Sequence, residues 1–285
     1  MIHKLVTLPA VLGFLLLTSS AAAQPQADAD RLNAALAALQ PQRPGVVDAY
    51  VVVAALDTDP VFSREAREAG KVLAQRFDAA GRTIVLGKDE GDGRVDADGT
   101  PPNLAFALAR AAELMDEDED VIVLYTTSHG VPNDGIVYRG ASLGAYIRPQ
   151  KLADGLGQLG FKNRLIMIQA CFSGQFVPVL KGSRTIIFTA AAADRSSFGC
   201  QAGNDWTYFG DALINHAFRQ PLPLDVEFRR AMALIAAAEK REDLTPSNPQ
   251  LSIGDQAQRW LAALDARAPK SASSPVGTSV LGLAK

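Results

Sequence analysis

The sequence is poor in the residues that build several kinds of site. Only 2 cysteines and 3 histidines occur among 285 residues. This excludes a disulfide-rich scaffold and a four-cysteine zinc module, and it leaves little for a histidine-rich metal centre. Lys and Arg number 28 against 31 Asp and Glu, a formal net charge of −3, so no broad basic surface for nucleic acid is expected. With 48% hydrophobic and 21% charged residues, the chain is predicted to fold as one large domain or two small ones.

The sequence also lacks an apolar run long enough to span a bilayer. The N-terminal run at residues 5–17 is too short, because a membrane-spanning helix needs about 20 residues. It is followed by Ala21 and Ala23, the small-x-small pattern that a signal peptidase accepts. Residues 1–23 are therefore predicted to be a signal peptide, with an uncleaved membrane anchor as the alternative. We expect a periplasmic or secreted protein without stable membrane association after cleavage.

Apolar strands alternate with amphipathic helices from Val46 onward. Strands are predicted at 46–56, 82–88, 120–130, 162–174 and 184–193, a hairpin at 135–143, and helices at 62–77, 102–115, 149–160, 208–219 and 224–240. The strands are too apolar to face water on either side, which favours a mostly parallel sheet with helices on both faces. The sequence therefore predicts an α/β fold.

The segments on either side of this pattern have a different composition. Residues 24–45 are rich in Ala, Gln, Asp and Pro and are interpreted as a linker with a short helix at 28–39. The domain itself is assigned to 46–266, and the tail at 267–285 is predicted to be disordered. The acidic stretch at 88–100 lacks the full ligand spacing of a calcium-binding loop. Neither a metal site nor a cofactor is therefore expected.

Two of the predicted strands end in reactive residues. His129 and Gly130 follow one strand, and Cys171 follows another. Because the carboxyl ends of parallel strands meet at one edge of a sheet, the imidazole and the thiol are expected to lie close together. A thiol beside an imidazole is the minimum apparatus for covalent acyl transfer. A short helix predicted at 174–180 would favour the thiolate through its free N–H groups.

The residues around these strand ends resemble a known family. Tyr-Thr-Thr-Ser-His-Gly at 125–130 and Gln-Ala-Cys-Phe-Ser-Gly at 169–174 are similar to the His-Gly and Ala-Cys motifs of the legumain family, the asparaginyl endopeptidase group of caspase-like cysteine peptidases. The segments at 189–200 and 204–211 resemble later elements of that family in the same order. The resemblance implies a caspase-like three-layer α/β/α sandwich with a mostly parallel sheet of about six strands.

The resemblance also implies roles for single residues. Cys171 matches the nucleophile that forms a thioester acyl-enzyme, and His129 matches the general acid/base. Gly130 matches the glycine whose N–H, together with that of Cys171, forms the oxyanion hole. The implied function is that of an exported cysteine endopeptidase acting on peptides or proteins, with cleavage after Asn or Asp.

Five further residues match the family's pocket for the substrate side chain. They are Arg64, Gln169, Ser196, Ser197 and Asp211. Gln169 stands where the family has an acidic residue, which predicts a less negative pocket and a narrower preference for Asn over Asp.

Several alternatives remain open from the sequence. Cys171 and Cys200 could form a disulfide, as a cysteine pair in an exported protein often does. The same acyl-enzyme could serve a transpeptidase, and the same fold could serve a peptide-binding pseudoenzyme. A serine hydrolase that uses Ser173 lacks the nucleophile-elbow spacing. His216 is interpreted as a structural residue.

Overall fold

A six-stranded sheet forms the centre of the molecule. The structure is a computed structural model and describes residues 20–89, 95–140 and 144–283. Across the sheet, the strands are β2 (Thr83–Leu86), β1 (Ala49–Ala55), β3 (Val121–Thr127), β7 (Asn163–Gln169), β8 (Thr185–Thr189) and β9 (Gln250–Ile253). All neighbouring pairs are parallel except β8 with β9. The predicted mostly parallel sheet of about six strands is confirmed.

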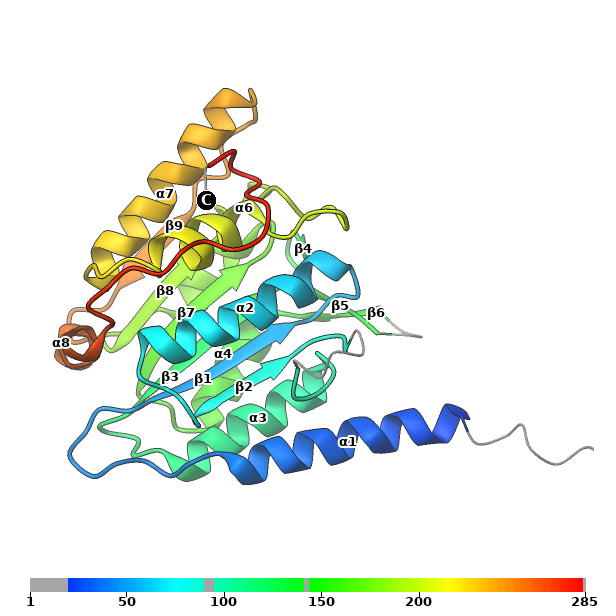
Figure 1. The fold of residues 1–285 in the computed structure, drawn as a ribbon, viewed down its shortest axis with the longest axis vertical. Helices are drawn as coiled ribbons and strands as arrows, with labels where there is room; N and C mark the ends of the chain where they lie inside the picture. The colour runs from blue at the N-terminus through cyan, green and yellow to red at the C-terminus, as the bar shows by residue number, and fades with distance from the viewer. Residues whose placement is uncertain (1–19, 90–94, 141–143, 284–285) are drawn as a thin grey trace, which may run out of the picture.

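Helices cover both faces of this sheet (Figure 1). One face carries α2 (Pro60–Arg76), α6 (Tyr208–Gly210), the π-helix η2 (Asp211–Ala217), α7 (Leu224–Arg241) and α8 (Gln258–Arg267). The other face carries α1 (Ser20–Ala38), α3 (Pro101–Leu114), α4 (Pro149–Gln158), the 3-10 turn η1 (Ser173–Phe176) and α5 (Val177–Leu180). The chain is therefore the predicted three-layer α/β/α sandwich.

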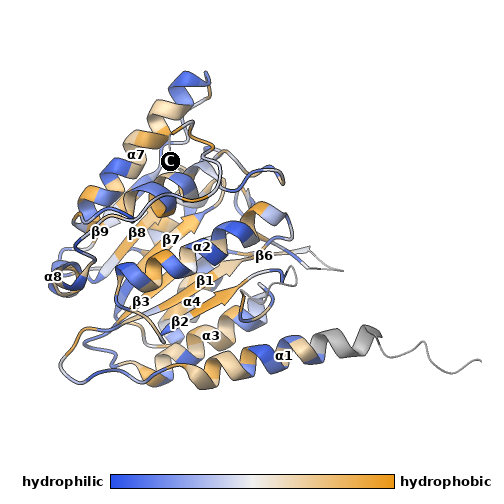
Figure 2. Ribbon diagram, in the orientation of Figure 1, coloured by the Kyte–Doolittle hydropathy of each residue, from blue (hydrophilic) through white to orange (hydrophobic). Residues whose placement is uncertain are grey.

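Two apolar cores follow from the alternation of side chains along each strand. Val51 and Val53 of β1 pack with Phe62 of α2 in one core. Tyr50 and Val52 pack with the helices of the opposite face in the other. Because both faces of the central strands are buried, the strands are continuously apolar, as Figure 2 shows. This double burial produced the sequence pattern from which the sheet was predicted.

A small antiparallel sheet projects beyond the carboxyl edge of the main sheet. It consists of β4 (Gly130–Val131), β5 (Gly135–Arg139) and β6 (Gly144–Ile147). The sequence predicted a single hairpin at 135–143, of which residues 141–143 lie outside the described residues. The third strand, β4, was missed because it has only two residues, too few to show an alternation of polar and apolar side chains. It matters because it begins at Gly130 in the candidate site.

The N-terminal segment that the sequence assigned to a linker is docked on the domain. Helix α1 packs against α3 and buries Leu32, and Leu39 directly after the helix is buried in the same core. Its Asp28 carboxylate accepts hydrogen bonds from the side chain of Asn103 and from the backbone N–H of Asp98. Residues 1–19 of the predicted signal peptide lie outside the described residues. No helix in the described part of the chain is long and apolar enough to cross a membrane.

The prediction of a disordered C-terminal tail is wrong for residues 268–283. This segment runs as an extended strap across the outside of η2 (Figure 1, red). Leu281 is buried in the core of that face. The side chain of Asn215 donates to the carbonyl of Val276 and accepts from its N–H. Low sequence complexity predicted disorder, but side chains of the domain satisfy the tail's backbone groups.

Candidate active site

His129, Gly130 and Cys171 meet because β3 and β7 are neighbouring parallel strands. Thr127 lies opposite Gln169 in the register, and the Ser128 N–H donates to the carbonyl of Gln169, so pairing continues to the end of both strands. A Cβ atom built on Gly130 would lie 2.0 Å from the carbonyl oxygen of Cys171. No side chain fits there, so only glycine permits this approach. The predicted meeting of the two strand ends is confirmed.

The thiol of Cys171 is held by a neighbouring loop. Its Sγ accepts a hydrogen bond from the Ser197 N–H at 3.3 Å and lies 3.5 Å from the Ser197 carbonyl oxygen. Phe172 has a φ of 58°, and its N–H donates to the carbonyl of Arg195 at 2.7 Å. A bulky residue adopts this left-handed conformation only when surrounding contacts enforce it. The helix predicted at 174–180 is a 3-10 turn followed by a single helical turn. The backbone N–H that donates to the Cys171 sulfur comes from Ser197 and not from this segment.

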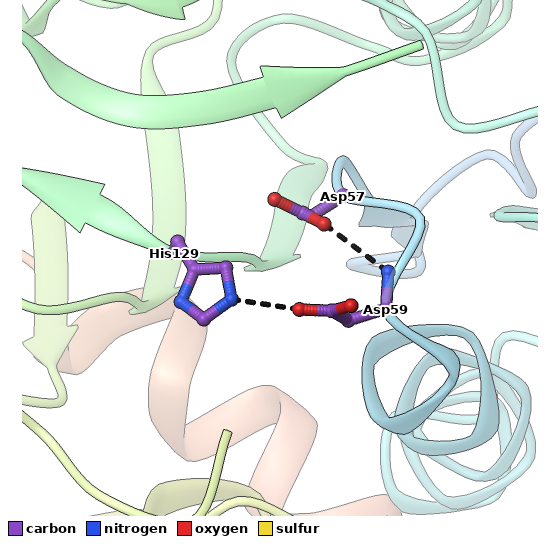
Figure 3. A group of neighbouring side chains, drawn as sticks. All are labelled: Asp57, Asp59 and His129. Atoms are coloured by element: carbon purple, nitrogen blue, oxygen red, sulfur yellow. Dashed lines mark hydrogen bonds and ion pairs between the residues drawn. The ribbon is translucent and has the colours of Figure 1, made fainter. Parts of the chain in front are cut away.

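The imidazole of His129 has a carboxylate partner that the sequence did not reveal. Its Nε2 lies 3.0 Å from Oδ2 of Asp59 (Figure 3). The ring of Phe62 packs edge-on against the imidazole, with centroids 5.0 Å apart. Asp59 is the N-cap residue of α2 and is followed by Pro60, but its side chain makes no capping hydrogen bond. It turns to His129 instead, which leaves Nδ1 as the ring nitrogen for the thiol.

Arg64 lies on the first turns of α2 beside the loop at 200–205. Its guanidinium donates to the carbonyl oxygens of Ala202 and Asn204, and its Nε lies 3.7 Å from a carboxylate oxygen of Asp205. Ser196 is exposed on the preceding part of the same loop, and Ser197 contacts the thiol. Arg64, Ser196 and Ser197 thus border one loop next to Cys171.

A comparison with known protein families identifies a conserved domain in this part of the chain. Residues 105–242 match the sequence profile of the Peptidase C13 family. The chain carries a Peptidase C13 domain. This is the legumain family that the motifs resembled, and the matched region includes His129 and Cys171 but not Asp59 or Arg64.

Among solved structures, the chain is similar to caspase-1 from Spodoptera frugiperda, with 13% identity and a TM-score of 0.48. That alignment covers 76% of this chain and 93% of the caspase chain. No curated protein matches the sequence.

Gln169 of the C13 domain does not face a substrate pocket. It is fully buried, and its Oε1 accepts hydrogen bonds from the Thr127 hydroxyl and the Ser128 N–H, both at 3.1 Å. Its Nε2 lies 3.6 Å from the Sγ of Cys200. Gln169 therefore braces the ends of β3 and β7. The expectation that Gln169 binds substrate does not fit this position, because its side chain is fully buried between the strand ends and Cys200.

Asp211 is also enclosed, contrary to the expectation that it binds substrate. Its carboxylate accepts hydrogen bonds from Asn215, from the Ser279 hydroxyl and from the Leu281 N–H, and it lies 3.3 Å from Nε2 of His216. Burial by itself would raise the pKa of Asp211, but the hydrogen bonds together outweigh it and hold this pKa below the ordinary value of 3.8. Asp211 therefore fastens the C-terminal strap to η2.

We predict that Asp211→Ala destabilises the C13 domain by about 3 kcal/mol, because it leaves several buried polar groups without their partner. The free energy of unfolding is measured by denaturant titration, with Asp154→Ala on the exposed face of α4 as the control. Since the folded pKa lies below 3.8, this contribution is complete above that pH and is lost as the pH falls below it. An unchanged unfolding free energy at neutral pH would contradict the fastening role.

Cys200 carries a partly buried thiol beside the nucleophile. Burial, and secondarily the neighbouring Cys171, raises the pKa of Cys200 to about 12. At neutral pH it is therefore protonated and a poor nucleophile. Cys171 and Cys200 are both free thiols, so the disulfide alternative is not formed in this structure.

Glu65 is a second residue that sequence reasoning missed. Its buried carboxylate accepts hydrogen bonds from the Tyr125 hydroxyl at 2.6 Å and from the N–H and hydroxyl of Thr207. Burial raises the pKa of Glu65 despite these donors. It joins α2 to β3 and to the start of α6, so it fixes the far end of the loop that borders Cys171. The available signal was its position three residues after Phe62, on the same side of the amphipathic helix predicted at 62–77.

Proposed function

We propose that this protein is a cysteine endopeptidase that hydrolyses peptide bonds through a thioester on Cys171. The C13 domain implies a peptidase with peptide or protein substrates. The observation that carries the assignment to these residues is the contact between Gly130 and the backbone of Cys171 at the ends of β3 and β7. It puts a thiol, an imidazole and two backbone donors at one edge of the sheet.

In the proposed acylation, Nδ1 of His129 accepts the proton of the Cys171 thiol, and Sγ attacks the scissile carbonyl carbon. The negative charge that develops on the carbonyl oxygen is stabilised by backbone N–H groups. The C–N bond then breaks, His129 protonates the leaving amine, and a thioester remains. Water deprotonated by His129 hydrolyses that thioester and restores the thiol.

The N–H of Gly130 is suited to the oxyanion because β5 does not use it. The Val137 N–H donates to the His129 carbonyl, which makes 129 and 137 a hydrogen-bonded pair of the antiparallel ladder. Gly130 and Ile136 form the next pair, and in such ladders hydrogen-bonded and non-hydrogen-bonded pairs alternate. The Gly130 N–H therefore points away from β5, on the strand that contacts Cys171.

We assign Asp59 the role of positioning His129. Its carboxylate fixes the ring orientation and leaves Nδ1 for the thiol. We predict that Asp59→Ala lowers kcat about ten- to a hundredfold with little change in KM, since the interaction is with the general base. Asp59→Asn keeps an acceptor oxygen and is expected to recover most of that loss. Steady-state kinetics of both variants test this; equal losses in the Ala and Asn variants, or a change confined to KM, would contradict it.

For the substrate side chain, we propose that Arg64 and the exposed Ser196 favour Asn or Asp before the scissile bond. Arg64 supplies a cationic donor, and Asp205 beside it supplies the acidic group that Asp211 was expected to provide. A pocket with both signs of charge matches the donor and acceptor of a primary amide.

Cleavage profiling on a diverse peptide mixture tests activity and specificity together. The expected result is cleavage after Asn and Asp, abolished by pre-treatment with a thiol-directed peptide electrophile that labels Cys171. Labelling without cleavage would favour the peptide-binding alternative, and joined peptides in the product mixture would favour the transpeptidase. Cleavage only after Arg or large apolar residues would contradict the proposed pocket.

We also propose that the protein is exported, on the apolar run and Ala-x-Ala pattern of residues 1–23. Intact-mass measurement on protein from its own host tests this proposal. A mature chain beginning near Gln24 is expected, and a mass that includes residues 1–23 would contradict cleavage.

A further inference from the structure

The histidine of the candidate site belongs to a second constellation, made with two aspartates. Asp57, Asp59 and His129 each offer one ligand atom, and these atoms lie within 4.8 Å of one another. Figure 3 shows the two carboxylates and the imidazole ring facing one shared space between the loop after β1 and the end of β3. Two oxygens and one imidazole nitrogen form a donor set suited to a borderline divalent metal ion.

Asp57 provides an independent indication of a ligand. The residue is 3% exposed, and its Oδ1 accepts a hydrogen bond from the Asp59 N–H at 3.1 Å. Its Oδ2 is buried without a hydrogen-bond partner among the residues that the structure describes. The one cation beside this oxygen in the described structure is the Arg139 guanidinium, with its Nε 3.6 Å away on a half-exposed side chain. A buried carboxylate oxygen is costly unless a partner compensates its charge.

We propose that Asp57, Asp59 and His129 form an inhibitory binding site for a divalent transition-metal ion, with Zn²⁺ as the best match. Zinc binds histidine nitrogen and carboxylate oxygen at about 2.0–2.2 Å. At tetrahedral angles these lengths separate two ligand atoms by about 3.4 Å. The 3.0 Å between Nε2 of His129 and Oδ2 of Asp59 therefore needs to widen by only a few tenths of an ångström. Oδ2 of Asp57, which accepts no hydrogen bond and has the Arg139 guanidinium 3.6 Å away, supplies the third ligand, and water completes the coordination.

Metal binding at this place would stop the proposed peptidase cycle. A metal ion on Nε2 takes that lone pair and leaves the ring's remaining proton on Nδ1. Nδ1 then has no lone pair with which to accept the thiol proton of Cys171. The ion also breaks the contact between His129 and Asp59. This inhibition rests on the proposed function, whereas the binding of metal does not.

Direct titration of Zn²⁺ into the full-length Cys171→Ala protein tests the site without the active-site thiol. Isothermal titration calorimetry is expected to show one zinc ion per chain. Asp57→Asn in this background keeps the acceptor for the Asp59 N–H, and it should weaken binding at least tenfold, because losing a ligand costs no less than losing an outer-shell partner. The matched control, Asp194→Asn, changes an exposed carboxylate and should bind zinc like the parent. Equal affinity in the Asp57→Asn and parent proteins would overturn the site.

Two further measurements keep the proposal testable if Asp57→Asn folds poorly. Arg139→Gln removes the competing cation and should tighten zinc binding, so unchanged or weaker binding would count against Asp57 as a ligand. Co²⁺ bound to the protein with Cys171 intact should give visible bands without a thiolate-to-cobalt band in the near ultraviolet. A thiolate band would overturn the proposal by assigning the metal to Cys171.

Inhibition is measured separately, as the ratio of peptidase rates with and without Zn²⁺ within each variant. The protein with Cys171 intact should lose activity with zinc and regain it with a chelator. Asp57→Asn in this Cys171-containing protein should need at least ten times more zinc for the same loss of activity. If the protein binds zinc as described but cleaves no peptide, the proposed function fails and the metal site stands. If peptides are cleaved and zinc inhibits the Asp57→Asn variant as strongly as the unsubstituted protein, the metal site fails and the peptidase assignment stands.

Discussion

Cys171→Ala is expected to abolish peptide cleavage while the domain stays folded. The thiol is the nucleophile of the proposed acyl-enzyme, and removing such a group typically costs at least about 10³-fold in kcat. The fold should survive because the side chain is half-exposed and contacts chiefly the backbone of Ser197. Activity is measured on the peptide that the profiling experiment selects, with circular dichroism and thermal melting as checks of folding.

The second cysteine supplies the matched control for this experiment. Cys200→Ala should retain most of its activity, because the pKa of Cys200 is raised to about 12 and its thiol is protonated at neutral pH. Turnover that persists in cleanly purified Cys171→Ala protein would refute the nucleophile assignment. Loss of activity in both variants, with both folded, would point to a role shared by the two sulfurs.

Gly130→Ala is expected to cause the second-largest loss, at least about 100-fold in kcat, the scale of removing one oxyanion-hole donor. The added Cβ would lie 2.0 Å from the carbonyl oxygen of Cys171 and 3.0 Å from its nitrogen. Both neighbours are backbone atoms, so no side-chain rotation relieves the clash. The ends of β3 and β7 must separate, which moves the Gly130 N–H away from the nucleophile.

The control for this variant is Gly157→Ala, because a Cβ at Gly157 in α4 meets no atom within 4 Å. Alanine in a helix is more favourable than glycine by about 1 kcal/mol, so this variant should keep its activity and melt no lower than the parent. Single-turnover measurement of thioester formation separates the chemical step from binding. A normal acylation rate in folded Gly130→Ala protein would show that this N–H does not serve the oxyanion.

The arrangement of His129 and Cys171 could be predicted from the sequence, because it depends on local order. Each residue follows an apolar strand directly, and parallel strands present their carboxyl ends at one edge whatever the details of packing. The same reasoning predicted the two-sided burial of β1, β3 and β7, since continuous apolar runs exclude an exposed face. Strand β9 was missed because it is short, antiparallel and at the edge of the sheet, where only one side is paired.

The partners of these residues were decided by the tertiary structure. Asp59 before Pro60 satisfies the local rule for a helix cap, yet its carboxylate bonds a histidine 70 positions later in the chain. Gln169 and Asp211 lie in motifs that resemble a substrate pocket, but burial and competing donors direct both side chains inward. Where a polar side chain points depends on which distant groups need a partner once water is excluded.

The sequence by itself determined the layer architecture, the edge of the sheet that carries the site, and the pair of residues that meet there. These features follow from hydrophobic periodicity and from strand direction, both of which are local properties of the chain. Only the tertiary structure decided that the C-terminal tail is a strap over Asp211 and that Asp57 and Asp59 converge on His129. Those outcomes depend on the pairing of buried polar groups, and such pairing is fixed by contacts between segments far apart in the sequence.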